Sequence, residues 1–141
     1  MIESGDVLKA RLLIVDDQVA NIRLLEKLLR GAGYVSVATT LDPRQVCEAH
    51  RKNRYDLILL DLQMPVMDGF EVMAGLKEIE KGASLPVLVV TVQPSYRLRA
   101  LRAGARDFLS KPFELAEVLK RVRHMLEISL FASGSWPALL H

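Results

Sequence analysis

The chain has 141 residues, half of them hydrophobic and 26% charged, with a net charge of +2. This profile indicates one globular domain, long enough to bury roughly two-thirds of its unfolded surface, and excludes a disordered chain. The charge is too small to indicate nucleic-acid binding by itself. No apolar run approaches the ~20 residues that cross a bilayer, the amino terminus lacks the features of a secretion signal, and the one cysteine, Cys47, excludes an internal disulfide. We therefore expect a soluble, cytoplasmic protein in a reducing compartment.

Strand-like and helix-like patterns alternate along residues 11–130. Three of the expected strands are nearly continuous apolar runs, which is typical of parallel strands covered on both faces. The expected strands are 11–15, 35–39, 55–60, 86–92 and 105–110. Residues 1–10 are interpreted as an N-terminal extension, and residues 131–141, which include Trp136, as a tail or the remnant of a linker.

Helices are expected between these strands because capping signals and apolar stripes recur there. Asp42 is followed by Pro43 and, at the third helical position, by Gln45; Asp68 is followed by Glu71 at the same spacing. The other helices are expected from about residue 18 to 31, from 94 or 95 to 104, and from 113 onward. Five strands alternating with five helices imply right-handed parallel crossovers. We predict an α/β fold with a doubly wound, five-stranded parallel sheet in the order 2-1-3-4-5.

Carboxylates stand at the carboxyl ends of two of these strands. Asp16 and Asp17 follow the first apolar run, and Asp61 follows the third. In the predicted order these two strands are neighbours, so the three acidic groups converge in the crevice where open α/β sheets bind ligands. Like charges that close need a counter-charge to remain ionised. The sequence therefore predicts a cation site.

Two further strand ends open on the same edge of the sheet. Thr91 lies near the end of the fourth expected strand, and Lys111 directly follows the fifth. Three carboxylates, a hydroxyl and an ammonium are the groups that handle a phosphoryl group together with Mg²⁺, which prefers hard oxygen ligands. Asp61, alone on its strand, is the candidate nucleophile. Each aspartate taken singly is more often a loop or helix-capping residue, but five such residues at four strand ends favour a site.

The same residues carry a resemblance to a known family. Four segments resemble the receiver domain of bacterial two-component response regulators, the CheY-like family, in the family's order and over residues 11–130; the segments are 13–17, 61–69, Thr91 and 104–113. The resemblance implies the flavodoxin-like fold. It also implies that Asp61 accepts a phosphoryl group from a sensor histidine kinase or a phosphotransfer protein, with Mg²⁺ as cofactor. The domain would then regulate a partner or an output domain and would catalyse only its own phosphorylation and dephosphorylation.

The resemblance implies a role for each site residue. Asp16 and Asp17 match the acidic pair of the magnesium site, and Gln63 stands where the family supplies a backbone carbonyl to the metal. Asp61 would serve as both acceptor and metal ligand.

Three other residues match the family's phosphate and switch positions. Lys111 matches the phosphate-binding lysine, and its bond to Pro112 is cis in the family. Thr91 matches the switch hydroxyl, and Phe108 matches the switch aromatic, which moves inward when the hydroxyl is drawn to the phosphate. One departure follows Thr91: Val92 occupies a position where the family usually has a smaller residue, so we expect it to hinder water or small phosphodonors.

Partners are also implied. In the family, the face formed by the fourth helix, the fifth strand and the last helix (the alpha4-beta5-alpha5 face) reports phosphorylation. Here four arginines lie on or after the expected helix 94–104: Arg97, Arg99, Arg102 and Arg106. The ordinary interpretation is a solvated face, and the functional one is a docking or homodimerisation surface. Membrane contact is not expected, and direct nucleic-acid binding is disfavoured because no helix-turn-helix follows.

Two other functions remain open at this stage. An aspartyl phosphatase would use a similar sheet, but it needs an acid two residues after the nucleophile, where this chain has Gln63. An interaction module that is never phosphorylated is disfavoured by the complete site. The chain continues for only about ten residues past the last expected helix, so we expect either a stand-alone regulator or a fragment of a longer protein.

Overall fold

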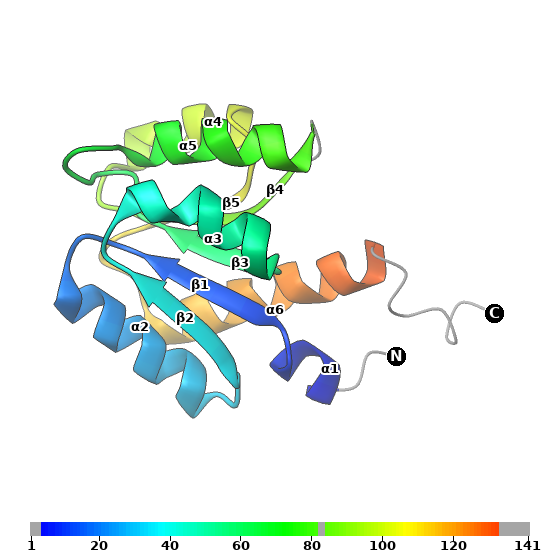
Figure 1. Cartoon of the computed structure of the whole chain (residues 1–141). Coiled ribbons are helices and arrows are strands. Elements are labelled where there is room, and N and C mark those ends of the chain that lie inside the picture. The colour runs from blue at the N-terminus through cyan, green and yellow to red at the C-terminus, as the bar shows by residue number, and fades with distance from the viewer. Residues whose placement is uncertain (1–3, 82–83, 133–141) are drawn as a thin grey trace.

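Five parallel strands form one sheet in the order β2-β1-β3-β4-β5 in the computed structural model, which describes residues 4–81 and 84–132 (Figure 1). The fold class and the strand order are those predicted. The strands are β1 Arg11–Val15, β2 Ser36–Thr40, β3 Leu57–Leu60, β4 Leu85–Thr91 and β5 Ala105–Ser110. Every residue of β3 and β4 is buried, as the continuous apolar runs indicated.

Helices cover both faces of the sheet (Figure 1). One face packs against α1, α2 and α6, and the other against α3, α4 and α5, so that the core consists of two apolar layers separated by the sheet. The helices are α1 Ser4–Leu8, α2 Val19–Gly31, α3 Val46–Asn53, α4 Gly69–Glu80, α5 Arg97–Arg102 and α6 Leu115–Ala132, with short 3-10 turns η1 Pro43–Gln45 and η2 Pro94–Tyr96 ahead of α3 and α5.

The N-terminal extension contributes to the core. Residues 4–8 form α1, in which Val7 is fully buried in the layer that contains α6. The carbonyl of Leu8 accepts the backbone N–H of Val35 at 3.2 Å. Val35 lies just before β2, which begins one residue later than expected, at Ser36. Residues 133–141, and with them Trp136, lie outside the described residues.

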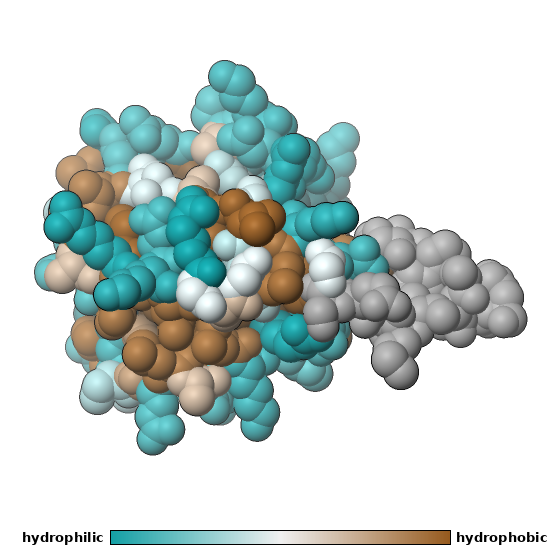
Figure 2. Space-filling model, turned by 90° about the horizontal axis from the view of Figure 1, so that it is seen from below, coloured by the Kyte–Doolittle hydropathy of each residue, from teal (hydrophilic) through white to brown (hydrophobic). Residues whose placement is uncertain are grey.

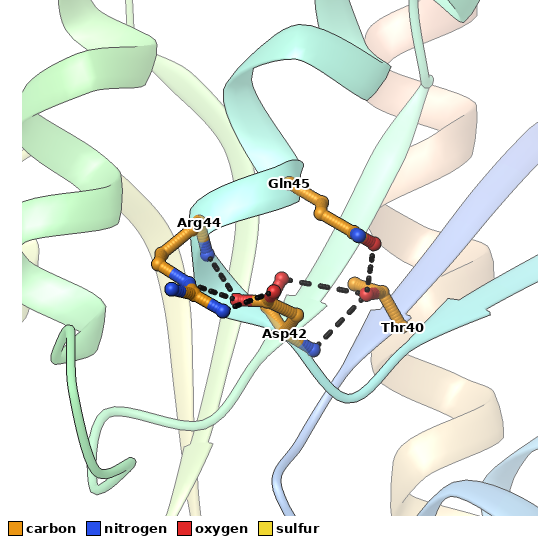
Figure 3. Close-up of polar contacts among 4 residues, drawn as sticks. All are labelled: Thr40, Asp42, Arg44 and Gln45. Atoms are coloured by element: carbon orange, nitrogen blue, oxygen red, sulfur yellow. Dashed lines mark hydrogen bonds and ion pairs between the residues drawn. The ribbon is translucent and has the colours of Figure 1, made fainter.

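Both predicted capping aspartates cap a helical turn, but in different ways. Asp68 accepts the N–H of Glu71 while the Glu71 side chain accepts the N–H of Asp68, which is the complete capping box expected. Asp42 instead accepts the N–H of Arg44 and is held by the Arg44 guanidinium at 2.9 Å through both carboxylate oxygens (Figure 3).

Gln45 does not form a capping box with Asp42. Its side-chain carbonyl accepts the hydroxyl proton of Thr40 at 3.3 Å, and the Thr40 hydroxyl in turn accepts the N–H of Asp42 at 3.1 Å (Figure 3). The expectation of a helix beginning at Pro43 is therefore corrected: residues 43–45 form a 3-10 turn, and the α-helix begins at Val46. The polar cluster fixes the loop after β2 at the carboxyl edge of the sheet.

The surface below the sheet, on the side of α1, α2 and α6, shows hydrophobic patches between hydrophilic side chains (Figure 2). Exposed large apolar residues of α2 and α6 are Val19, Leu24, Leu115 and Ile128. No described helix is long and apolar enough to span a bilayer.

Candidate functional site

Three carboxylates meet at the carboxyl edge of the sheet. Asp16 and Asp17 follow β1 and Asp61 follows β3, and because these strands are hydrogen-bonded neighbours, one oxygen from each residue lies within 4.8 Å of the others. Asp16 and Asp61 are buried, and Asp17 is half-buried. The convergence predicted from the sequence is therefore present in the structure.

The ammonium of Lys111 reaches this cluster from the end of β5. Its Nζ lies 3.0 Å from Asp16 Oδ2 and 3.3 Å from Asp61 Oδ2. The backbone N–H of Lys111 donates to the carbonyl of Thr91 at 2.7 Å, and the Lys111–Pro112 bond is cis. One ammonium against three carboxylates leaves an excess of negative charge in a partly desolvated pocket. The donor set of hard oxygens thus fits a magnesium ion.

Backbone groups hold the carboxylates in place. Gln63 donates its N–H to Asp61 Oδ1 at 3.1 Å, and Gln18 donates its N–H to Asp16 Oδ1 at 2.9 Å. The Asn21 amide donates to Asp16 Oδ2 at 3.3 Å. These bonds orient both carboxylates before any ligand binds, which reduces the entropic cost of binding.

Burial raises the pKa of Asp61, and the nearby Asp16 carboxylate adds to this effect. The Gln63 N–H and the Lys111 ammonium act in the opposite direction and lower the pKa without cancelling the increase. The ionised form of Asp61 is therefore poorly solvated in the free protein. A cation or another charge-compensating group in the pocket would offset this cost.

Thr91 ends β4 beside the cluster and is fully buried. Its hydroxyl has no hydrogen-bond partner within the described part of the chain. A buried unsatisfied hydroxyl is unfavourable, so a hydrogen-bond acceptor brought within reach of this group would be stabilised by it. Phe108, on the neighbouring strand β5, is 7% exposed and packs in the layer with α4 and α5. It therefore already occupies an inward position.

An open pocket of about 380 Å³ lies over the cluster. Asp61, Asp17, Gln63 and Lys111 line it, whereas Thr91 and Phe108 do not contribute to its wall. Its lining also includes two residues that the sequence reasoning missed, Gln18 and Asn21, and the departure noted above, Val92. Only the proximity of Gln18 to the acidic pair in the sequence could have suggested its role.

The model of the response regulator receiver domain family matches residues 12–123. The chain belongs to this family. It is 39% identical over 122 residues to the transcriptional regulatory protein PrrA of Mycobacterium tuberculosis, covering 85% of this chain and 51% of PrrA. It is 38% identical over 125 residues to the response regulator PleD of Caulobacter vibrioides, covering 87% of this chain and 27% of PleD. The chain thus spans about half the length of PrrA and a smaller part of PleD.

A solved structure shows the same architecture with a metal in place. The receiver domain of the sensor histidine kinase PA1611 from Pseudomonas aeruginosa, which has a magnesium ion coordinated in its active site cleft, superimposes with a TM-score of 0.75 and 30% identity. The match covers 84% of this chain and 98% of that domain. This receiver domain is therefore a regulatory module of a two-component system, with an acidic cluster suited to a metal.

Proposed function

We propose that this receiver domain is a switch operated by phosphorylation of Asp61. The supporting observation is the joint placement of three carboxylates and one ammonium at a pocket, on the sheet edge where β4 ends in a buried hydroxyl that has no partner among the described residues. The phosphoryl donor would be a sensor histidine kinase or a phosphotransfer protein. The proposed domain spans residues 11–130, which is slightly longer than the family match.

The chemistry assigns a task to each residue. An oxygen of Asp61 attacks phosphorus and forms a P–O bond, while the donor's P–N bond breaks and its electron pair returns to the imidazole. Lys111 neutralises one phosphoryl oxygen, and the N–H of Gln63 keeps Asp61 oriented. Mg²⁺ bound by Asp16, Asp17, Asp61 and the Gln63 carbonyl would supply charge neutralisation for the transferring group. Attack of water on the same phosphorus would restore Asp61 and release phosphate.

The Thr91 hydroxyl would couple this event to the protein surface. A phosphoryl oxygen on Asp61 would give the hydroxyl the hydrogen-bond partner that it lacks within residues 4–81 and 84–132, and this differential contact would favour one of two arrangements of the β4–α5 loop. Phe108, which is already buried in the layer with α4 and α5, would be held in that inward position. The affected surface is the α5–β5–α6 face, which corresponds to the family's alpha4-beta5-alpha5 face.

That face carries arginines that have no acidic partner in the described part of the chain. Arg97 and Arg102 make no ion pair with any described residue, whereas Arg121 of α6 binds Asp107 at 2.7 Å and Glu117 at 2.8 Å. The docking interpretation of Arg97, Arg99, Arg102 and Arg106 is therefore retained as part of this proposal. Homodimerisation through the face also stays a prediction, and sedimentation of the phosphorylated protein tests it.

Intact mass spectrometry after incubation with acetyl phosphate tests the central step. The wild type should gain one phosphoryl group only when Mg²⁺ is present, and Asp61→Asn should gain none. Asp68→Asn is the matched control: it lies in the same loop, and asparagine preserves a helix cap. It should be labelled normally. Labelling of Asp61→Asn at the wild-type rate would refute the assignment, and steady turnover of a phosphate ester abolished by this substitution would support an aspartyl phosphatase instead.

A further inference from the structure

The half-buried side chain of Asn21 reaches the acidic cluster from α2. Asn21 is the third residue of this helix, and side chains of an α-helix point back towards its amino terminus. Its amide therefore lies towards the loop between β1 and α2, where Nδ2 donates to Asp16 Oδ2 at 3.3 Å. An ionised carboxylate can only accept hydrogen bonds, so the NH2 group of the amide is the part that faces Asp16. Nothing in the proposed chemistry uses this contact.

Asp16 Oδ2 is shared between the Asn21 amide and the Lys111 ammonium, whose Nζ lies 3.0 Å away. The other oxygen of Asp16 accepts the backbone N–H of Gln18. Lys111 also contacts Asp61 at 3.3 Å, and it is the group that neutralises a phosphoryl oxygen in the proposed chemistry. When Lys111 turns towards that oxygen, Asn21 is the side-chain donor that remains on Asp16 Oδ2 among the described residues.

We propose that Asn21 is a positioning residue for the cation site: it keeps Asp16 oriented while Lys111 moves from Asp16 to the phosphoryl group. The inference rests on the proposed function, because it takes Asp61 as the acceptor and Lys111 as the group that binds the phosphoryl oxygen.

An amide suits this task better than a second lysine would. A carboxylate that is already oriented loses less entropy when it binds a metal ion. The amide of Asn21 is neutral, so it holds the carboxylate without the repulsion that an ammonium exerts on a nearby cation. Groups that hold metal ligands in place change metal affinity by ~10–100-fold when they are removed. Asn21 should therefore affect Mg²⁺ binding although it is not itself a ligand.

Calorimetric titration with Mg²⁺ tests this contact without any phosphoryl donor. Asn21→Ala should weaken Mg²⁺ binding about fivefold, somewhat less than is typical of such residues, because two other donors still hold Asp16. Asn53→Ala is the matched control and should bind Mg²⁺ like the wild type. Its half-buried amide donates to the Tyr55 hydroxyl at 3.1 Å, ahead of β3 and thus at the opposite edge of the sheet. An unchanged affinity of Asn21→Ala, or an equal loss in both variants, would overturn the inference.

A second background separates positioning from a general loss of structure. In Lys111→Ala, Asn21 is the remaining side-chain donor to Asp16 within the part of the chain that the structure describes. Adding Asn21→Ala to Lys111→Ala should therefore weaken Mg²⁺ binding further by about tenfold, more than the same substitution does in the wild type. A loss of the same size in both backgrounds would overturn the inference, because the two side chains would then act independently.

Labelling of Asp61 by acetyl phosphate separates this role from one in the chemical step. Asn21→Ala should need about five times more Mg²⁺ for half-maximal labelling, while its maximal rate stays within about twofold of the wild type. A lower maximal rate at an unchanged Mg²⁺ requirement would overturn the positioning role. A wild type that binds Mg²⁺ but is not labelled would instead overturn the proposed function, whereas the calorimetric comparison decides the role of Asn21 by itself.

Discussion

Two consecutive strand–helix units, β3–α4 and β4–α5, lie side by side on the sheet but differ in how firmly they are held. In the first, the Asp61 carboxylate binds the Gln63 N–H and Lys111, and α4 has a complete capping box and four buried residues. In the second, the Thr91 hydroxyl has no partner among the described residues, and the six-residue α5 has no side-chain cap and buries only Ala100.

The difference suits the two units to different roles: one holds the candidate acceptor, and the other can move. The β3–α4 unit keeps the candidate acceptor in a fixed orientation, which phosphoryl transfer requires. The β4–α5 unit has few buried contacts, so its local displacement costs little free energy. Besides the pairing of β3 with β4, two contacts of Phe70 in α4 link the units: the Arg99 guanidinium lies 3.7 Å from the centre of the Phe70 ring, and Tyr96 packs edge-on against the same ring. Through these contacts a shift of α5 remains connected to the unit that holds the acceptor.

The largest effect should come from Gly69, where the first unit has no spare space. A Cβ at this position would lie 2.7 Å from Leu62 Cα and 2.8 Å from the Asp61 carbonyl oxygen, so backbone has to move. We expect Gly69→Ala to lower the free energy of unfolding by about 1–3 kcal/mol and to weaken Mg²⁺ binding. Urea unfolding with and without Mg²⁺ measures both. Gly31→Ala, which meets nothing within 4 Å, should cost no stability; a similar loss in both variants would contradict the close-packing argument.

Removing the polar side chain near the start of each helix should lower the free energy of unfolding more in the first unit than in the second. Asp68→Ala deletes the capping box of α4 and should cost about 1 kcal/mol in unfolding free energy. Ser95→Ala, in the 3-10 turn ahead of α5, deletes a hydroxyl that caps no backbone N–H and should change stability by less than about 0.5 kcal/mol. Thermal unfolding of both variants under one set of conditions provides the comparison. Equal losses would mean that α5 is capped as firmly as α4.

Thr91→Val should raise the free energy of unfolding, whereas Gly69→Ala and Asp68→Ala lower it. The substitution replaces an unsatisfied buried hydroxyl with a methyl group of similar size, so we expect the unphosphorylated protein to become more stable, by up to about 1 kcal/mol. The variant should still accept a phosphoryl group on Asp61. Hydrogen exchange in α5, which we expect to change on phosphorylation of the wild type, should then stay constant. A destabilised variant would show that the hydroxyl has a partner in solution.

The sequence was sufficient for the sheet and for the assembly of the site, for a physical reason. Continuous apolar runs identify strands covered on both faces, and the polar residues at their ends must meet at one edge. It could not predict α1, because a five-residue helix shows no period and is held by tertiary contacts of Val7 and Leu8. The Thr91 hydroxyl, which has no partner among the residues described, and the left-handed backbone of Val66 also depend on three-dimensional surroundings.

Val92 gives the smallest expected effect, and it tests whether access to the pocket is limited on the side of the second unit. The side chain is 53% exposed, directly follows β4, and lines the same pocket as Asp61 and Lys111. Val92→Ala removes two methyl groups from the pocket wall without opening a cavity in the core, so stability should stay within about 0.5 kcal/mol of the wild type. Acetyl-phosphate labelling or dephosphorylation should become faster, because small donors and water meet less obstruction. Mass spectrometry over time measures both rates, and equal rates in the two proteins would show that the valine does not limit access to Asp61.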